Sequence, residues 1–284
     1  MSENTTRYSS ELREQSGRRS LRWLILISFL ALVIALSVIL GAMGAVMGFQ
    51  ETRQAAVEHL QIAANLKQQQ IERWMDDRGA DLAVLSIDFA LVDNLKDLRE
   101  QKEESEAYRA TYSDLFAQLT GFLQRKSAFT ELFVMDADSG ITLLSTDLLR
   151  EGESHSSKLY FEQGKQETYY RSMSASPFDP DLQVPFLMIT HPVRDPDTDR
   201  VIAVLGGRAN LRDLGDVINE MGGLEGTSET YLVSSKQQII VSSRGVEAQG
   251  RAAHSLGIEA ALDGQDGWDT YQSYTGEEVT GAYR

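Results

Sequence analysis

The chain has 284 residues, of which 42% are hydrophobic and 24% are charged. This composition is typical of a globular protein with room for two ordinary domains, and it excludes collagen-like and low-complexity chains. The formal net charge of −15 argues against a nucleic-acid partner, because no basic patch interrupts the acidic background. The chain has no cysteine, which excludes a disulfide framework and thiolate metal sites.

An uncharged apolar run extends from Trp23 to Phe49. As a helix rising about 1.5 Å per residue, this run exceeds the roughly 30 Å hydrocarbon core of a bilayer. Five arginines and three glutamates precede it, so the positive-inside rule places residues 1–22 in the cytoplasm. We therefore predict a transmembrane helix over 23–49, with the lipid bilayer as partner and the residues after 50 outside the cytoplasm. A cleaved signal peptide is the alternative, and the length of the run argues against it.

The sequence from Gln50 to Leu85 has the periodicity of an amphipathic helix. Its apolar stripe consists of Val57, Leu60, Ala64, Ile71, Trp74, Leu82 and Leu85. Lys67 and Arg78 occupy two gaps in that stripe. A second helical pattern covers residues 108–126, so we predict a stalk helix and a helical segment within 50–126.

After Ser127 the apolar period changes to that of strands. In residues 127–222 we predict strands at 131–136, 141–145, 168–176, 185–193 and 200–209, and helices at 158–163 and 211–221. In residues 223–284 we predict strands at 229–234, 239–242, 268–274 and 279–283, and a helix at 252–262. Each unit reads as a hairpin, a helix and further antiparallel strands, which is a PAS-like α+β module. The second module is expected to be incomplete, because it stops one strand short.

Three passages resemble the double Cache sensor domains of bacterial signal-transduction receptors. They are LFVMDADSGITLLST at 132–146, the stretch from Pro185 to Leu214, and GLEGTSETYLVSSKQQIIVSSR at 223–244. The resemblance covers about residues 50–284. It implies a membrane-distal sensor module at 127–222 and a membrane-proximal one at 223–284, in a bacterial inner-membrane receptor.

The resemblance also implies a function for these residues. They would sense a small molecule outside the cytoplasm for a histidine kinase, a cyclic-di-GMP enzyme or a chemoreceptor. A homodimer is expected and no cofactor is implied. The stalk helix, with its apolar stripe, is a candidate dimer contact, although the same stripe would also serve to pack against modules of its own chain.

In the resembling family a small molecule lies between the distal sheet and the short helix and loop that cover it. Carried over to this sequence, the ligand-binding residues are Tyr160 and Phe161 on the helix, Tyr170 and Ser172 on the next strand, and Thr190 and Arg208 on later strands. Simpler roles remain open: Tyr160 and Phe161 would also serve to close the core, and Arg208 would also serve to pair with an acid such as Asp213.

The sequence departs from the amino-acid-binding members of that family at two points. Those members have an Arg-x-Trp-Tyr run after the helix and an aspartate near the last strand. Here the run reads Tyr169-Tyr170-Arg171, without tryptophan, and Arg208 stands at the expected position of the aspartate. Because arginine offers a planar, bidentate fork to a carboxylate, we predict a small organic anion as ligand.

No catalytic or metal-binding motif is evident. The four histidines are scattered, and neither a phosphate-binding glycine loop nor a nucleophile elbow is present. The acids at 195, 197 and 199 suit a solvated turn as well as a weak cation site. We therefore expect no enzymatic activity in these residues. Two alternatives stay open: a membrane-tethered hydrolase, which requires Ser172, His191 and an acid within hydrogen-bond reach, and a structural protein that associates through its stalk.

Overall fold

The computed structural model describes the backbone of residues 4–102, 105–173, 186–220 and 228–284, and side chains for most of them. The chain divides into two compact units, Met1–Glu58 and His59–Arg284. The helices are α1 (Asn4–Ser86), α2 (Phe89–Glu100), α3 (Glu106–Arg125), η1 (Leu148–Arg150), α4 (Leu159–Gly164), α5 (Arg212–Asn219), η3 (Val246–Ala248) and α6 (Leu256–Leu262). The strands are β1 (Phe129–Asp136), β2 (Thr142–Ser145), β3 (Tyr169–Met173), β4 (Phe186–Arg194), β5 (Val201–Ala209), β6 (Tyr231–Val233), β7 (Ile239–Ser242), β8 (Gly267–Gln272) and β9 (Glu278–Tyr283).

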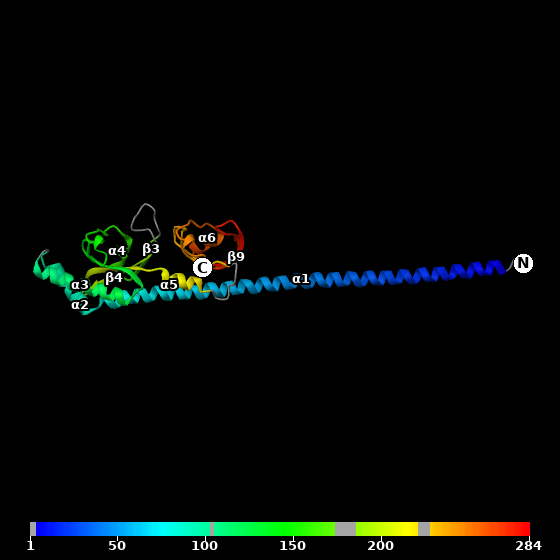
Figure 1. Ribbon diagram of the computed structural model, residues 1–284, viewed down its shortest axis with the longest axis horizontal. Helices are drawn as coiled ribbons and strands as arrows, with labels where there is room; N and C mark the ends of the chain where they lie inside the picture. The colour runs from blue at the N-terminus through cyan, green and yellow to red at the C-terminus, as the bar shows by residue number, and fades with distance from the viewer. Residues whose placement is uncertain (1–3, 103–104, 174–185, 221–227) are drawn as a thin grey trace. The chain divides into compact units, whose positions relative to one another are not determined.

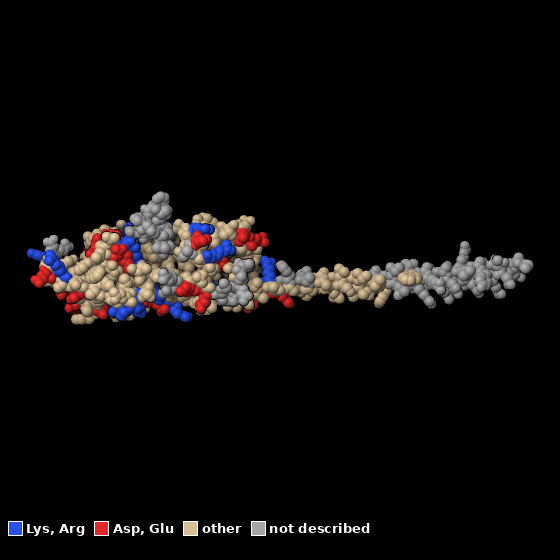
Figure 2. All heavy atoms as spheres, viewed as in Figure 1, with Lys and Arg blue, Asp and Glu red and all other residues tan. Residues whose placement is uncertain are grey.

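Helix α1 is continuous from Asn4 to Ser86, so the apolar run and the amphipathic stretch lie on one helix. It ends where Asp88 caps α2, the Asp88 carboxylate accepting hydrogen bonds from the next backbone amides. Large apolar side chains between Phe29 and Met47 are exposed along α1, and Figure 2 draws this stretch without acidic or basic atoms. Among the residues that the structure describes, no helix combines the length and the apolarity that a membrane crossing requires.

The distal module is built on a five-stranded antiparallel sheet with strand order β2-β1-β5-β4-β3. Strand β5 lies at the centre, between β1 and β4, and Figure 1 shows α4 beside this sheet. The register places Phe133 opposite Gly206 and Met188 opposite Arg208. The predicted strands and short helix are therefore confirmed within the described residues, with ends that differ by a few residues. Positions 174–176 and 185 of two predicted strands lie outside the described residues.

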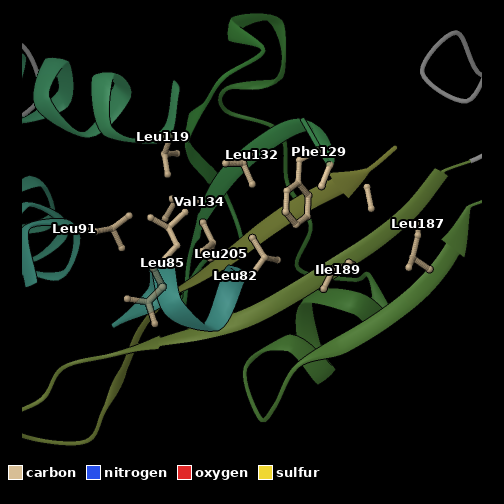
Figure 3. Packing of buried hydrophobic residues seen from close by; sticks show 14 of the residues in the cluster. Leu82, Leu85, Leu91, Leu119, Phe129, Leu132, Val134, Leu187, Ile189 and Leu205 are labelled. Atoms are coloured by element: carbon tan, nitrogen blue, oxygen red, sulfur yellow. The ribbon is translucent and has the colours of Figure 1, made fainter. Parts of the chain in front are cut away.

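One face of this sheet packs against the helices. Figure 3 shows Leu82 and Leu85 of α1, Leu91 of α2 and Leu119 of α3 meeting strand residues Leu132, Val134, Ile189 and Leu205. All of these side chains are at most 4% exposed. Burial of this apolar surface, at roughly 25 cal/mol per Å², holds the sheet on the helices. The expected stripe of α1 is thus buried against its own chain at Trp74, Leu82 and Leu85.

Helix α2 binds the turns at one end of the sheet. The Nζ atom of Lys96 lies 2.7 Å from Asp195 and 3.2 Å from Asp197. Arg99 approaches Asp136 at 3.0 Å and Asp138 at 2.6 Å. These aspartates of the turns are therefore paired with Lys96 and Arg99 of the same chain. In the part of the chain that the structure describes, no cluster of three or more histidines or acids has the arrangement of a metal site.

The proximal module repeats the order hairpin, helix, hairpin. Strand β6 pairs with β7, β8 pairs with β9, and α6 lies between the two hairpins in the chain. A small core joins Ile239 of β7 to Ala248 of η3, Ala253 and Ile258 of α6. The four predicted strands and the helix of this module are confirmed, but the strands form two separate two-stranded sheets and not one continuous sheet. The expected incompleteness of the module stays a prediction.

Candidate functional site

The candidate site lies between the second face of the distal sheet and α4. A separate apolar cluster joins this face to α4 and has Tyr169 packed against it. Its members are Phe133, Met135, Phe186, Met188 and Val204 of the sheet and Tyr160 and Phe161 of α4. Thr190 on β4 fixes α4, because its hydroxyl donates a 2.8 Å hydrogen bond to the carbonyl oxygen of Tyr160. Gly164 permits this approach, since a Cβ there would overlap the Thr190 side chain. The helix therefore covers β4 closely.

A buried histidine ties the loop before α4 to the sheet. The Nδ1 atom of His155 lies 2.7 Å from the Tyr160 hydroxyl, and its Nε2 atom lies 2.9 Å from the Thr142 hydroxyl on β2. The ring also packs beside Phe133, with centroids 5.8 Å apart. Both nitrogens are thus satisfied by neutral hydroxyl groups, and His155 holds the Tyr160 phenol in one orientation.

Arg208 and Glu131 form a buried ion pair across β5 and β1. The Nε atom of Arg208 lies 2.8 Å from Oε2 of Glu131, and the two residues are register partners in the sheet. Ser145 donates a 2.9 Å hydrogen bond to the same carboxylate, and Arg150 approaches it at 3.4 Å. The guanidinium of Arg208 lies over the Phe186 ring, 4.7 Å from its centroid.

The charges around Tyr160 are mainly positive. Burial lowers the pKa of His155 to about 4, and the nearby cations Lys158, Arg208 and Arg150 add to this effect. Burial raises the pKa of Tyr160 to about 12, and Glu153 adds to the shift, while Arg208, Arg171 and Arg150 oppose it. His155 is therefore neutral at pH 7, and Tyr160 keeps its proton. Burial also raises the pKa of Glu131, against the opposing effects of Arg208, Ser145 and Arg150.

The structure brings four of the six predicted ligand residues to this face: Tyr160, Phe161, Thr190 and Arg208. Phe161 is 1% exposed, so its described role is to close the core. Arg208 has an ion-pair partner, as the alternative proposed, but the partner is the buried Glu131. The side chain of Asp213 lies outside the described residues, and so does that of Ser172, whose backbone pairs with Leu187 in β3.

Tyr170 requires a correction. It packs into the helix-facing core, with its hydroxyl against Gly79 of α1, and so lies on the opposite face from Tyr160. Its neighbour Tyr169 lies on the α4 face instead. Successive strand side chains point to opposite faces, so a one-residue error in assigning the strand exchanges the two tyrosines.

Sequence reasoning missed His155, Glu131 and Arg150. Glu131 was detectable, because it precedes Phe133 and Met135 at alternate positions of β1 and thus belongs to an inward face. A carboxylate on such a face requires a buried cation as partner. His155 comes from a loop and Arg150 ends the one-turn helix η1, and no sequence periodicity indicates that such residues reach the sheet.

The hydrolase alternative required Ser172 and His191 to meet. Ser172 pairs with Leu187, four residues from His191 on β4. That separation corresponds to roughly 13 Å along the strands. The Nδ1 atom of His191 lies 2.7 Å from the Thr168 hydroxyl. These two residues therefore do not form a nucleophile–base pair.

The fold matches solved sensor domains of bacterial receptors. The sensor domain of the V. cholerae histidine kinase DctB aligns with a TM-score of 0.56 and 15% identity, over 77% of this chain and 83% of that one. The sensory domain of the Campylobacter jejuni chemoreceptor Tlp3 with isoleucine bound aligns with a TM-score of 0.57 and 14% identity, over 82% of this chain and 89% of that one. The ligand-binding domain of the Pseudomonas aeruginosa chemoreceptor PctC in complex with GABA aligns with a TM-score of 0.51 and 15% identity, over 79% and 90%.

The chain thus has the fold of periplasmic sensor domains of the Cache type, as the resemblance predicted. No family model and no curated protein matches the sequence itself.

Proposed function

We propose that this chain is the extracytoplasmic sensing region of a membrane-bound receptor and that its distal module binds a small organic anion. The observation that carries the proposal is the charge around Tyr160. Three arginines (Arg150, Arg171 and Arg208) act on that phenol. Acids lie beside two of them: the buried Glu131 pairs with Arg208, and the more exposed Asp147 and Glu153 approach Arg150 at 3.2 and 3.8 Å.

A carboxylate ligand would complete this charge distribution. These acids offset Arg208 and Arg150, so a ligand anion beside Arg208 would meet the further positive charge of Arg171. Guanidinium groups recognise carboxylates through paired hydrogen bonds, which supplies orientation as well as affinity. Isoleucine and GABA, the ligands named for two of the similar structures, both carry a carboxylate.

The membrane topology is a proposal of the same kind. Residues 23–49 would cross the bacterial inner membrane, with residues 1–22 in the cytoplasm. The uncharged run and its exposed apolar side chains support this reading. The output attached to such a sensor would be a histidine kinase, a cyclic-di-GMP enzyme or a chemoreceptor.

A homodimer through α1 is also proposed. Ile62, Leu66 and Val84 are between 48% and 65% exposed on the part of α1 that belongs to the second unit. A second copy of this helix would bury them.

The test is a thermal-shift screen of the full chain in detergent with organic acids, amino acids and polyamines. We expect an organic acid to raise the melting temperature, and we expect the double variant Glu131→Gln, Arg208→Gln to lose that shift. Arg200→Ala is the matched control, because Arg200 precedes β5 by one residue and is 67% exposed in its pair with Asp138. An acid-induced rise in melting temperature that survives the double variant would contradict the anion site. Stabilisation by polyamines alone would show that the site prefers a cation.

A further inference from the structure

A buried lysine of α1 holds the end of α5. Lys67 is 6% exposed, and its Nζ atom donates hydrogen bonds to the carbonyl oxygens of Val217, Ile218 and Glu220 at 2.8, 3.0 and 2.6 Å. These carbonyls belong to the last turn of α5 and the residue that follows it. Lys67 is one of the two charged residues that interrupt the apolar stripe of α1, and this contact accounts for its place there.

Helix physics explains why a lysine suits this position. The last carbonyls of a helix lack partners within the helix, and the partial negative charge there favours a cation. An ammonium group has three protons to donate, and three carbonyls receive them. Burial lowers the pKa of Lys67, and Glu220 opposes the shift. The three hydrogen bonds offset the free-energy cost of removing the ammonium charge from water.

Helix α5 is also attached to the proximal module. Leu214 and Ile218 of α5 are each 2% exposed and belong to one apolar cluster with Ile240 and Val241 of β7. In the chain α5 follows β5, the central strand of the distal sheet, and precedes β6. It therefore connects the two modules while Lys67 connects it to α1.

We propose that Lys67 is a latch that fixes α5 to α1, so that a shift of α5 is passed to α1 at this point. The apolar contacts of α5 fix its rotation and axial position less sharply, since the hydrophobic effect is non-directional. Three hydrogen bonds from one buried ammonium group set both the rotation and the axial position of α5. The proposal concerns this attachment alone and does not require the distal module to bind an anion.

Hydrogen exchange on the full chain in detergent, read by mass spectrometry, tests the latch. In Lys67→Met we expect the amides of α5 and β7 to exchange at least tenfold faster, while those of β1, β4 and β5 keep their wild-type rates. Lys126→Met is the matched control, because Lys126 also contacts α1, at 2.8 Å from Asp81, but is 50% exposed. That variant should leave α5 unchanged.

Two results would overturn the latch. One is unchanged exchange in α5 of Lys67→Met, and the other is an equal acceleration throughout the distal sheet, which would indicate a general stabilising role. A measurement on the unmodified chain covers the case in which Lys67→Met does not fold. The latch requires α5 amides to be protected to the same degree as those of α1 around Lys67, and exchange of α5 within seconds while α1 stays protected would refute it.

Discussion

The phenol of Tyr170 packs against Gly79 of α1, at a point where a Cβ on residue 79 would overlap the tyrosine hydroxyl. Tyr170 is on β3, and its neighbour Tyr169 lies on the candidate ligand face of the same strand. Adjacent residues of β3 therefore contact the site on one side and α1 on the other. A displacement of β3 at the site would reach α1 through this contact.

Gly79→Ala should destabilise the protein by about 1–3 kcal/mol, because an added methyl group overpacks a closed contact. Urea unfolding measures the change. Tyr170→Ala in the same chain should recover part of the loss by removing the overlapping ring, which a double-mutant cycle detects. Gly121→Ala on α3 is the control, since there the added Cβ meets only the end of Arg125, and it should be neutral or slightly stabilising. Equal losses in Gly79→Ala with and without Tyr170 would show that the ring is not the obstacle.

Arg208→Met alone should destabilise the fold by about 3–5 kcal/mol, because it leaves the Glu131 carboxylate buried beside a weaker set of partners. The double variant Glu131→Leu, Arg208→Met should recover most of that loss, since it removes both charges from the interior. Chemical denaturation of the single and double variants provides the comparison. A double variant as unstable as Arg208→Met would mean that packing of the Arg208 stem over Phe186, not charge, dominates.

Stability should fall as pH decreases below about 6.5. The pKa of His155 is lowered to about 4 by burial, so over this interval the unfolded chain binds a proton that the folded chain excludes. One such proton contributes at most about 1.4 kcal/mol per pH unit. Burial also lowers the pKa of His191, which adds to the same slope.

His155→Gln should flatten the pH dependence between pH 4 and 6.5, as measured by urea midpoints across that range. The exposed His254 offers a control, and His254→Gln should leave the slope as it is. An identical slope in His155→Gln and the unmodified chain would assign the proton uptake to another group.

Tyr169→Ala should weaken binding of an organic acid found in the screen by tenfold or more, because Tyr169 packs on the α4 face. Tyr170→Phe, which alters only the hydroxyl on the other face, should leave the affinity within about twofold. Isothermal titration calorimetry of both variants separates them. Loss of binding in Tyr170→Phe, with normal binding in Tyr169→Ala, would show that the ligand binds on the face of the sheet that packs against α1.

The order of elements was readable from the sequence because apolar periodicity is a local property. Strand patterns such as Ile239–Ser242 and the helical stripe of α1 depend on residues a few positions apart, and the structure reproduces both. The change of period after residue 127 likewise marked the start of the distal sheet. Arg208, by contrast, was singled out by the resemblance and not by periodicity.

Tertiary structure alone decided which side chains meet. Glu131 and Arg208 are brought together by strand register, His155 and Thr142 by a loop, and Lys67 and Val217 by the packing of α5 on α1. Side chains of a strand alternate between the two faces, so a one-residue shift decides which face Tyr170 occupies, and strand propensity does not fix that register. Such contacts join residues far apart in the chain, so they form and stabilise the protein only once the chain has folded.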